Sequence, residues 1–272
     1  MKAEFLDISQ TQLKRWARLD ETKFRHAEGI FLAEGVKVVE ELLSSDWQVE
    51  AILVLPDKMK YWEELVDKTD SNIPIYSITD SQWKKLSQDK EPEGIMAVVQ
   101  IRPELDLTSF LSTSQGNVLI LYEINNPGNM GALMRSAHWF GFTNIILSTN
   151  SADYTNPKNV RASMGSLFHL TIVSDVDLIA ALPQIKKTHY LVGSDVREGL
   201  PPHPLPQKVA LLLGNESHGL PGQLLDLADE RWCIPGNARA DSLSLPQAAT
   251  IMMYECVKKC HAISSAGGGV TQ

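Results

Sequence analysis

Polar side chains able to bind or react with a ligand gather in four segments, each directly after an apolar run. These segments are 125–129 (NNPGN), 196–202 (VREGLPP), 217–219 (SHG) and 236–246 (GNARADSLSLP). If the apolar runs are parallel strands, the segments share the carboxyl edge of one sheet, where ligands bind in such folds. Glycines there let main-chain amides approach a ligand closely. Ordinary turn formation explains any one segment alone, so the inference of a site depends on all four together.

Arg135 lies on a helix that we expect to begin near residue 130. Four residues form the apolar face of that helix: Met130, Leu133, Met134 and Ala137. Arg135 points away from this face, and its neighbours one turn back, Gly131 and Ala132, are small. We therefore expect room for the guanidinium to bind a phosphate or hydroxyl group; a surface arginine without a ligand is the alternative. The sequence contains neither a P-loop nor a GxGxxG fingerprint.

The composition indicates a packed globular protein. Of the 272 residues, 43% are hydrophobic and 21% are charged. No apolar run approaches the roughly 18 residues that span a bilayer, and residues 1–16 lack the apolar stretch of a signal peptide. We therefore predict a cytoplasmic protein without a membrane contact. The three cysteines give no disulfide framework. Cys256 and Cys260 are one helical turn apart, so a shared metal is conceivable, but buried thiols are preferred because no other ligand pair completes a tetrahedral site.

The net charge of −8 argues against binding nucleic acid through bulk electrostatics, although a local basic patch remains possible. One segment, 12–29, is rich in basic side chains. They are Lys14, Arg15, Arg18, Lys23, Arg25 and His26. We predict RNA contacts for Lys14, Arg15 and Arg18. The alternative is a solvated helix face, which is what most charged runs form.

The pattern of elements predicts two α/β domains. In residues 1–105, a basic N-terminal helix and an apolar helical pattern over 31–45 precede strands at 49–55, 73–78 and 94–101, with helices at 59–66 and 79–87 between them. Residues 106–116 lack a clear period and are interpreted as a linker. The second domain, 117–262, has near-continuous apolar strands, as in a parallel sheet buried on both faces. These are predicted at 118–124, 144–149, 167–173, 189–195, 209–216 and 231–235. A disordered tail is expected over 263–272.

The last helix predicts an association between two copies of the chain. Its apolar residues cover an arc of about 180°, wider than the roughly 100° that one core face needs. They are Leu245, Ala248, Ala249, Met252, Met253, Cys256, Val257 and Cys260. A second packing partner explains the excess. Deeper burial within one subunit is the alternative.

Four segments resemble, in order and spacing, the motifs of the SpoU/TrmH family of RNA 2′-O-ribose methyltransferases, in the SPOUT superfamily. They are NPGNMGALMRSAHWFGF, NPKNVRASMGSLFHL, LLLGNESHGL and IPGNARADSLSLPQAA, within residues 117–260. The segments FLAEGVKVVEELL and GIMAVV are similar to the substrate-binding domain that many members carry in front of the catalytic domain. The resemblance implies an α/β fold with a C-terminal trefoil knot and a homodimer. It also implies S-adenosylmethionine bound largely by main-chain groups around Gly193, Gly214, Ile234 and Leu243.

The resemblance also implies roles for individual side chains. Asn129, Arg135, Glu216 and Ser242 match the motif residues of the catalytic site, and Arg161 matches a position expected to contact the RNA backbone. A guanidinium is a poor base because its pKa exceeds 12. We therefore expect Arg135 to clamp the phosphate next to the ribose and to stabilise the developing alkoxide. Asn129 would position the ribose or Arg135, and Glu216 would orient these donors.

The third motif departs from the family pattern. Ser244 stands where the family usually has Asn, and Pro246 follows it. Ser244 is expected to cap the last helix, with Pro246 in its first turn. The predicted function is S-adenosylmethionine-dependent 2′-O-methylation of RNA, with ribosomal RNA favoured over transfer RNA by analogy alone. The alternative is a non-catalytic RNA-binding relative that keeps the fold.

Overall fold

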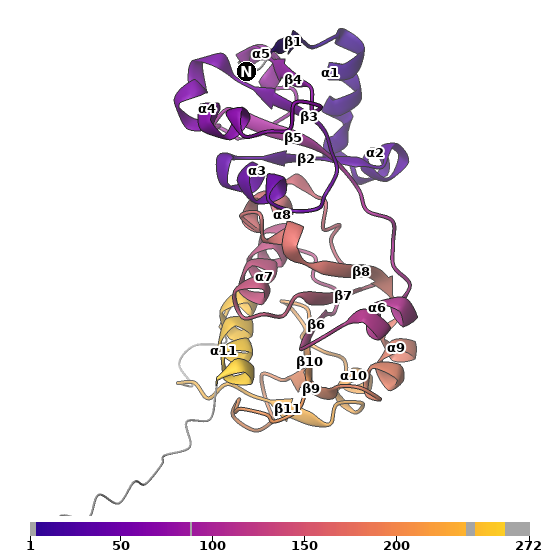
Figure 1. Ribbon diagram of the computed structural model, residues 1–272. Helices are drawn as coiled ribbons and strands as arrows, with labels where there is room; N and C mark the ends of the chain where they lie inside the picture. The colour runs from indigo at the N-terminus through magenta and orange to yellow at the C-terminus, as the bar shows by residue number, and fades with distance from the viewer. Residues whose placement is uncertain (1–3, 88, 238–242, 259–272) are drawn as a thin grey trace, which may run out of the picture.

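The computed structural model describes residues 4–87, 89–237 and 243–258 and contains two α/β units, each built on its own sheet (Figure 1). The N-terminal sheet has the order β1-β4-β3-β5-β2. Its strands are β1 (Phe5–Asp7), β2 (Ile30–Glu34), β3 (Val49–Val54), β4 (Ile75–Ser77) and β5 (Ile95–Gln100). Strands β1, β4 and β3 are parallel, and β5 runs antiparallel between β3 and β2.

Short helices cover this sheet. They are α1 (Gln10–Ala17), η1 (Arg18–Asp20), α2 (Thr22–Glu28), α3 (Val36–Leu43), η2 (Pro56–Lys58), α4 (Met59–Asp67) and α5 (Asp80–Trp83). Thr79 caps α5 through a capping box with Gln82, as its sequence indicates. The basic N-terminal helix is confirmed as α1, although the structure adds the short edge strand β1, which the sequence analysis missed because its three residues are all exposed.

The single helical pattern expected over 31–45 is wrong in its first part. Residues 30–34 form strand β2, which is buried throughout, and α3 begins only at Val36. Gly35 separates the two elements with a φ of +113°, a conformation that favours glycine. A strand buried on both faces has no alternation, so its apolar run cannot be told from a helix by periodicity alone.

The C-terminal sheet is entirely parallel, with the order β11-β9-β10-β6-β7-β8. Its strands are β6 (Val118–Leu121), β7 (Asn144–Ser148), β8 (Thr171–Val176), β9 (Tyr190–Ser194), β10 (Val209–Leu213) and β11 (Glu230–Trp232). All six lie within or beside their expected ranges. The largest difference is at 167–173, where η3 (Ser166–His169) occupies the first part and β8 begins only at Thr171.

Helices cover both faces of this sheet (Figure 1). One face packs against α7 (Pro127–Trp139), α8 (Pro157–Ala162) and α11 (Leu245–Val257), and the other against α6 (Leu107–Thr113), α9 (Leu178–Ile185) and α10 (Gly222–Leu225). Helix α6 lies inside the segment interpreted as a linker. Asp106 caps it, and Phe110 is fully buried against the sheet, so this segment is part of the C-terminal unit.

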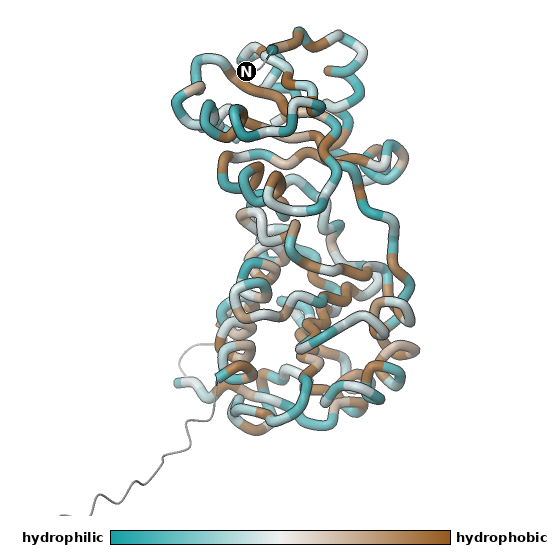
Figure 2. Tube along the Cα trace, viewed as in Figure 1, coloured by the Kyte–Doolittle hydropathy of each residue, from teal (hydrophilic) through white to brown (hydrophobic). Residues whose placement is uncertain are grey.

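The two units share an apolar core. Phe168, from η3, stacks on Phe31 with ring centroids 6.4 Å apart and meets the edge of Trp47 at 5.6 Å. All three side chains are buried and belong to one continuous cluster that includes strands of both sheets. Figure 2 shows hydrophobic stretches along the strands inside each unit. The units are therefore packed together and not merely tethered.

Candidate active site

The four polar segments found in the sequence follow four adjacent strands. Segments 125–129, 196–202, 217–219 and 236–246 follow β6, β9, β10 and β11, whose order in the sheet is β11-β9-β10-β6. Because these strands are parallel, their carboxyl ends lie on one edge. The prediction that the segments share one edge is confirmed over the residues that the structure describes.

The turn before α7 is a helix cap. Asn126 Oδ1 accepts hydrogen bonds from the main-chain N–H groups of Gly128 (2.8 Å) and Asn129 (3.3 Å). Pro127 occupies the first turn, where its missing N–H has no cost. The Asn-Pro-Gly-Asn sequence thus starts α7 sharply at the edge of the sheet and sets Asn129 within its first turn.

Asn129 and Glu216 are brought together from positions 87 residues apart. The Nδ2 of Asn129 donates to Oε1 of Glu216 at 3.1 Å. Glu216 is carried by a tight loop in which Asn215 and Gly219 exchange main-chain hydrogen bonds. A side chain on Gly214 would place its Cβ 2.3 Å from the carbonyl carbon of Gly219, so this loop can close only over glycine. The predicted link between the first and second motifs is present in the structure.

Arg135 is exposed on α7, while the four residues of the predicted apolar face are all buried. Among the described residues, Arg135 has no hydrogen-bond or ion-pair partner. It lies six residues beyond Asn129, about 9 Å along the helix axis. Its guanidinium is therefore available to a ligand at the polar edge.

The predicted small-residue groove beside Arg135 is wrong in one respect. Gly131 is buried, and a Cβ there would lie 2.6 Å from both the Cβ of Ala162 and the carbonyl oxygen of Asn159. Gly131 is small because α8 packs directly against α7, not because a ligand needs the space. Ala132 is only partly buried and remains beside Arg135.

The proposed cofactor positions lie at neighbouring strand ends. Gly193 is buried in β9, Gly214 follows β10, Ile234 is half-buried after β11, and Leu243 is exposed. A Cβ at Gly214 would overlap the backbone of Gly219 and Leu220, so this glycine is required for the loop to close. Leu243 presents exposed apolar surface, of the kind that can pack against the apolar parts of a cofactor.

The third motif is only partly within the described residues. Ser242, which was predicted to be catalytic, and the expected disordered tail 263–272 lie outside them. Ser244 occupies the N-cap position of α11 as predicted, but its side chain makes no capping hydrogen bond. Pro246 in the first turn lacks an N–H, which removes one of the donors that a capping side chain normally accepts.

The basic residues have different surroundings. Lys14 is exposed, and the Arg18 guanidinium lies 3.5 Å from the ring centroid of Phe24. Arg15 pairs with Glu28 at 2.8 Å and Glu50 at 2.7 Å, and hydrogen bonding to these carboxylates raises its pKa above the ordinary value. Lys14 and Arg18 are thus the more accessible members of the predicted RNA-binding set.

Two further arginines, Arg25 of the basic segment and Arg161, which was matched to an RNA-contacting position, connect the two units. Arg25 is fully buried. Arg161 pairs with Glu34 at 2.5 Å and with Asp89 at 3.3 Å. Both carboxylates belong to the N-terminal unit, so the Arg161 guanidinium binds protein groups in this structure.

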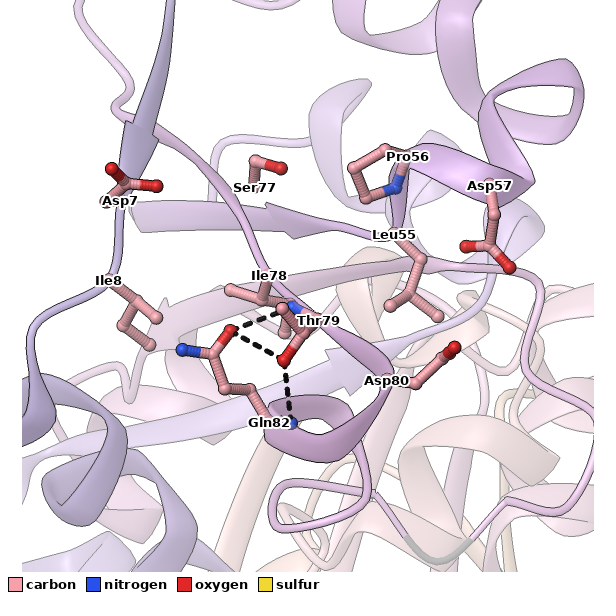
Figure 3. Close-up of a pocket in the computed structure, with 10 residues that line it drawn as sticks. All are labelled: Asp7, Ile8, Leu55, Pro56, Asp57, Ser77, Ile78, Thr79, Asp80 and Gln82. Carbon is pink, nitrogen blue, oxygen red and sulfur yellow. Dashed lines mark hydrogen bonds between the residues drawn. The ribbon is translucent and has the colours of Figure 1, made fainter.

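A separate hollow of about 600 Å³ lies in the N-terminal unit, at the carboxyl ends of β1, β3 and β4 (Figure 3). Its lining includes Asp7, Asp57 and Asp80, whose carboxylates repel phosphate groups. We therefore do not assign the RNA backbone to this hollow.

Glu123 supports the site and was missed by the sequence analysis. It has a φ of +49°, uncommon for a residue with a side chain. Its N–H donates to Ser148 Oγ at 2.8 Å, its carbonyl accepts from Asn215 Nδ2 at 2.7 Å, and its Oε2 lies 3.6 Å from His218 Nε2. Nothing in the local sequence indicates this conformation, because it is imposed by partners on two neighbouring strands.

Two observations bear on metals and membranes. Over the described ranges, no group of three His, Cys, Asp or Glu side chains is arranged to hold a metal ion, and no helix is long and apolar enough to span a membrane. Cys256 is partly buried, and burial raises the pKa of its thiol to about 12. Cys260 lies outside the described residues.

Comparison with known proteins identifies the family. The model of the SpoU rRNA Methylase family matches residues 116–254, and that of the MRM3-like substrate binding domain matches residues 10–97. The chain belongs to the SpoU rRNA methylase family. The resemblance drawn from the four motifs is thereby confirmed, as is the expectation of a substrate-binding domain in front of the SpoU domain.

The relatives are similar over almost their full lengths. A 23S rRNA (guanosine(2553)-2′-O)-methyltransferase, RlmP of Bacillus subtilis, is 30% identical over 246 residues, covering 89% of this chain and 94% of the relative. A 23S rRNA (uridine(2479)-2′-O)-methyltransferase of Streptomyces viridochromogenes is 28% identical, covering 91% and 90%. The crystal structure of AviRb from the same organism, in complex with AdoMet, has a TM-score of 0.80 at 27% identity and covers 92% and 97%.

Replacing the N-cap residue by alanine should affect stability differently in α7 and α11. Asn126→Ala should lower the free energy of unfolding by about 1 kcal/mol, because two N–H groups lose their acceptor. Ser244→Ala should change it by less than about 0.5 kcal/mol, because no capping bond is lost. Urea denaturation of both variants measures this, and an equal loss in the two would contradict the assignment.

Proposed function

We propose that this protein transfers a methyl group from S-adenosylmethionine to a ribose 2′-hydroxyl of ribosomal RNA. The observation that carries the proposal is the Asn129–Glu216 pair at the sheet edge where α7 begins, together with Arg135, six residues further along the same helix, which no described residue engages. This arrangement of side chains occurs in a member of the SpoU rRNA methylase family. The relatives named as 23S rRNA 2′-O-methyltransferases favour ribosomal over transfer RNA, and this substrate in turn supports the proposed cytoplasmic location.

Each side chain has a distinct task in this reaction. When bound, S-adenosylmethionine supplies an electrophilic methyl group. Glu216 accepts a hydrogen bond from Asn129 Nδ2, which fixes the amide and leaves its Oδ1 to accept from the ribose hydroxyl. The Arg135 guanidinium binds the adjacent phosphate and stabilises the negative charge that develops on the 2′-oxygen as its proton passes to solvent water. Gly193, Gly214, Ile234 and Leu243 would hold the cofactor, mainly through their main-chain groups.

The two units have different proposed roles. Residues 1–105 bind the RNA, with Lys14 and Arg18 as the accessible cations and Arg15 held beside them by Glu28 and Glu50. Residues 117–262 carry the reaction. Ser242 and the trefoil knot remain part of the proposal on the strength of the motif resemblance. The presence of Asn129, Arg135 and Glu216 and the contact between Asn129 and Glu216 support the enzyme over the non-catalytic alternative.

A homodimer is also proposed, through exposed apolar side chains on α7 and α11. Trp139 is 84% exposed at the end of α7, and α11 exposes Ile251, Tyr254 and Val257 on the side away from its buried methionines. The rings of Phe140 and Tyr254 are 6.3 Å apart, so the two helices contribute to one surface. A second copy would cover this surface. This agrees with the wide apolar arc of the last helix.

Arg135→Ala should lower single-turnover methyl transfer to ribosomal RNA by at least about 100-fold, because one charged donor to the developing alkoxide is lost. The exposed position of Arg135 predicts an unchanged fold and unchanged binding of S-adenosylmethionine by calorimetry. Normal transfer by the variant would contradict this role. Absence of transfer by wild-type protein, on RNA shown to bind, would contradict the proposed function.

The RNA-binding surface is tested by Lys14→Glu combined with Arg18→Glu. These exposed cations are one helical turn apart, so the change should weaken RNA binding. It should also make the RNA affinity less dependent on salt: the slope of log affinity against log salt concentration should become smaller by about 1 for each lost phosphate contact. Cofactor binding should be unchanged. The matched control is Lys84→Glu with Lys85→Glu, which reverses two exposed charges elsewhere in the same unit. Equal RNA affinities for the two double variants would show that Lys14 and Arg18 form a solvated face and do not bind RNA.

The dimer is tested by sedimentation of Ile251→Glu. A charge on the exposed face of α11 should convert the protein to monomers at micromolar concentration, since an unpaired charge is costly to bury. Ile179→Glu is the matched control, because Ile179 is similarly exposed (47% against 39%) but lies on α9, across the sheet. A monomeric wild-type protein, or dissociation in both variants, would contradict the proposed surface.

A further inference from the structure

Arg25 occupies an unusual position for a residue in a basic segment. Its side chain is completely buried and lies between the two units. On the N-terminal side, Nη1 donates to the carbonyl oxygens of Leu19 and Asp20, both at 2.9 Å, and Nη2 donates to Thr22 Oγ1 at 2.9 Å. The two carbonyls belong to η1, the turn that also carries Arg18. Arg25 thus holds the backbone beneath the proposed RNA-binding surface.

On the other side, Arg25 binds the C-terminal unit through Asp153. Its Nε and Nη2 donate to Asp153 Oδ2 at 3.1 and 2.5 Å, and Nε also donates to Thr155 Oγ1 at 3.0 Å. Burial by itself would raise the pKa of Asp153, but hydrogen bonds from Thr155 and the charge of Arg25 lower it below its ordinary value. The pair is therefore ionised at neutral pH.

The loop that carries Asp153 also supports the active-site turn. The N–H of Ala152 donates to the carbonyl oxygen of Ile124 at 2.8 Å. Ile124 directly precedes the segment in which Asn126 caps α7 and sets the position of Asn129. One buried guanidinium therefore connects η1, the 149–156 loop and the turn before α7 through a short series of hydrogen bonds.

Helix α8 makes a second connection between the same parts. Gly131 allows α8 to pack against α7, and Arg161 on α8 binds Glu34 of β2, whose carboxylate also accepts from Ser87 Oγ. Figure 1 shows α8 between α7 and the N-terminal unit. The units are thus held by the buried Arg25–Asp153 pair and the partly exposed Arg161–Glu34 pair as well as by the shared aromatic contacts, and both connections end beside α7.

We propose that Arg25 is a positioning residue for methyl transfer: through Asp153 it keeps the RNA-binding unit in one fixed placement relative to the turn that presents Asn129. The role rests on the proposed function. An RNA bound to residues 1–105 then delivers its ribose at a set distance from Arg135. Because a misplacement of about 1 Å can cost 100-fold in rate, a loosened clamp reduces transfer even when both partners stay bound.

Asp153→Asn is the sharpest test of this role. Asp153 Oδ1 accepts from the N–H and Oγ1 of Thr155 at 2.8 and 2.6 Å, and an asparagine Oδ1 can keep both bonds. The amide nitrogen would then face the donors of Arg25, so the two bonds from Arg25 to Asp153 are lost, while its bond to Thr155 Oγ1 and its bonds within the N-terminal unit can remain. Asp46→Asn is the matched control: Asp46 also pairs with an arginine, Arg102, but the pair is exposed and Asp46 is not part of either proposed site.

Single-turnover transfer should fall at least tenfold in Asp153→Asn at saturating RNA and S-adenosylmethionine, while the dissociation constants of both ligands change less than threefold. Asp46→Asn should behave as wild type. A purely structural role would lower the melting temperature but leave the rate per folded molecule unchanged. That result, or equal rates in both variants, would overturn the proposal.

Hydrogen exchange on the full-length protein gives a readout that needs no substrate. Asp153→Asn and Arg25→Lys should accelerate exchange of the Ala152 amide and of the first turn of α7, while β9 and β10 keep wild-type protection. Arg25→Lys retains the charge but cannot reach all five acceptors, so its effect should be partial. Unchanged exchange at Ala152 would overturn the coupling, whereas an inactive wild-type protein with the expected exchange would contradict only the proposed function.

Discussion

The close approach of α8 to α7 at Gly131 determines how the rest of the molecule is arranged. A methyl group at this position would overlap Ala162 and the carbonyl of Asn159, so any larger residue would push the helices apart. Helix α7 carries Asn129 and Arg135, and α8 carries Arg161, which holds the N-terminal unit. One close contact between two helices therefore connects the helix of the proposed catalytic side chains to the helix that binds the N-terminal unit.

The charge distribution reconciles an acidic protein with a polyanionic substrate. The net charge is −8, and the hollow in the N-terminal unit is lined by aspartates. The exposed cations Lys14 and Arg18 lie instead on α1 and η1. Local fields of this kind steer a charged ligand to one surface while the remaining surface repels it. Specific placement of the RNA, rather than strong general affinity, is the expected consequence.

The elements near the site were largely predictable because they have strong local signals. The apolar runs of β6, β9 and β10 read as buried parallel strands, and the Asn-Pro-Gly-Asn segment reads as a helix start. Glu216 was expected to orient Asn129 and Arg135; it accepts a hydrogen bond from Asn129, while Arg135 has no partner among the described residues. Strand β2 was mistaken for part of a helix, and α6 for a linker, because a fully buried strand and a short polar helix lack the periods that identify them.

The sequence by itself determined the family, the parallel sheet and the identity of the residues at its polar edge, since these depend on local patterns and ordered motifs. It could not distinguish Arg25 from Arg18, which stand seven residues apart in the same basic segment. Only the tertiary structure decided that Arg18 is exposed over Phe24 while Arg25 is buried against Asp153, 128 residues away. The reason is physical: a buried charge is tolerated only where the fold supplies its partners, and those partners come from distant parts of the chain.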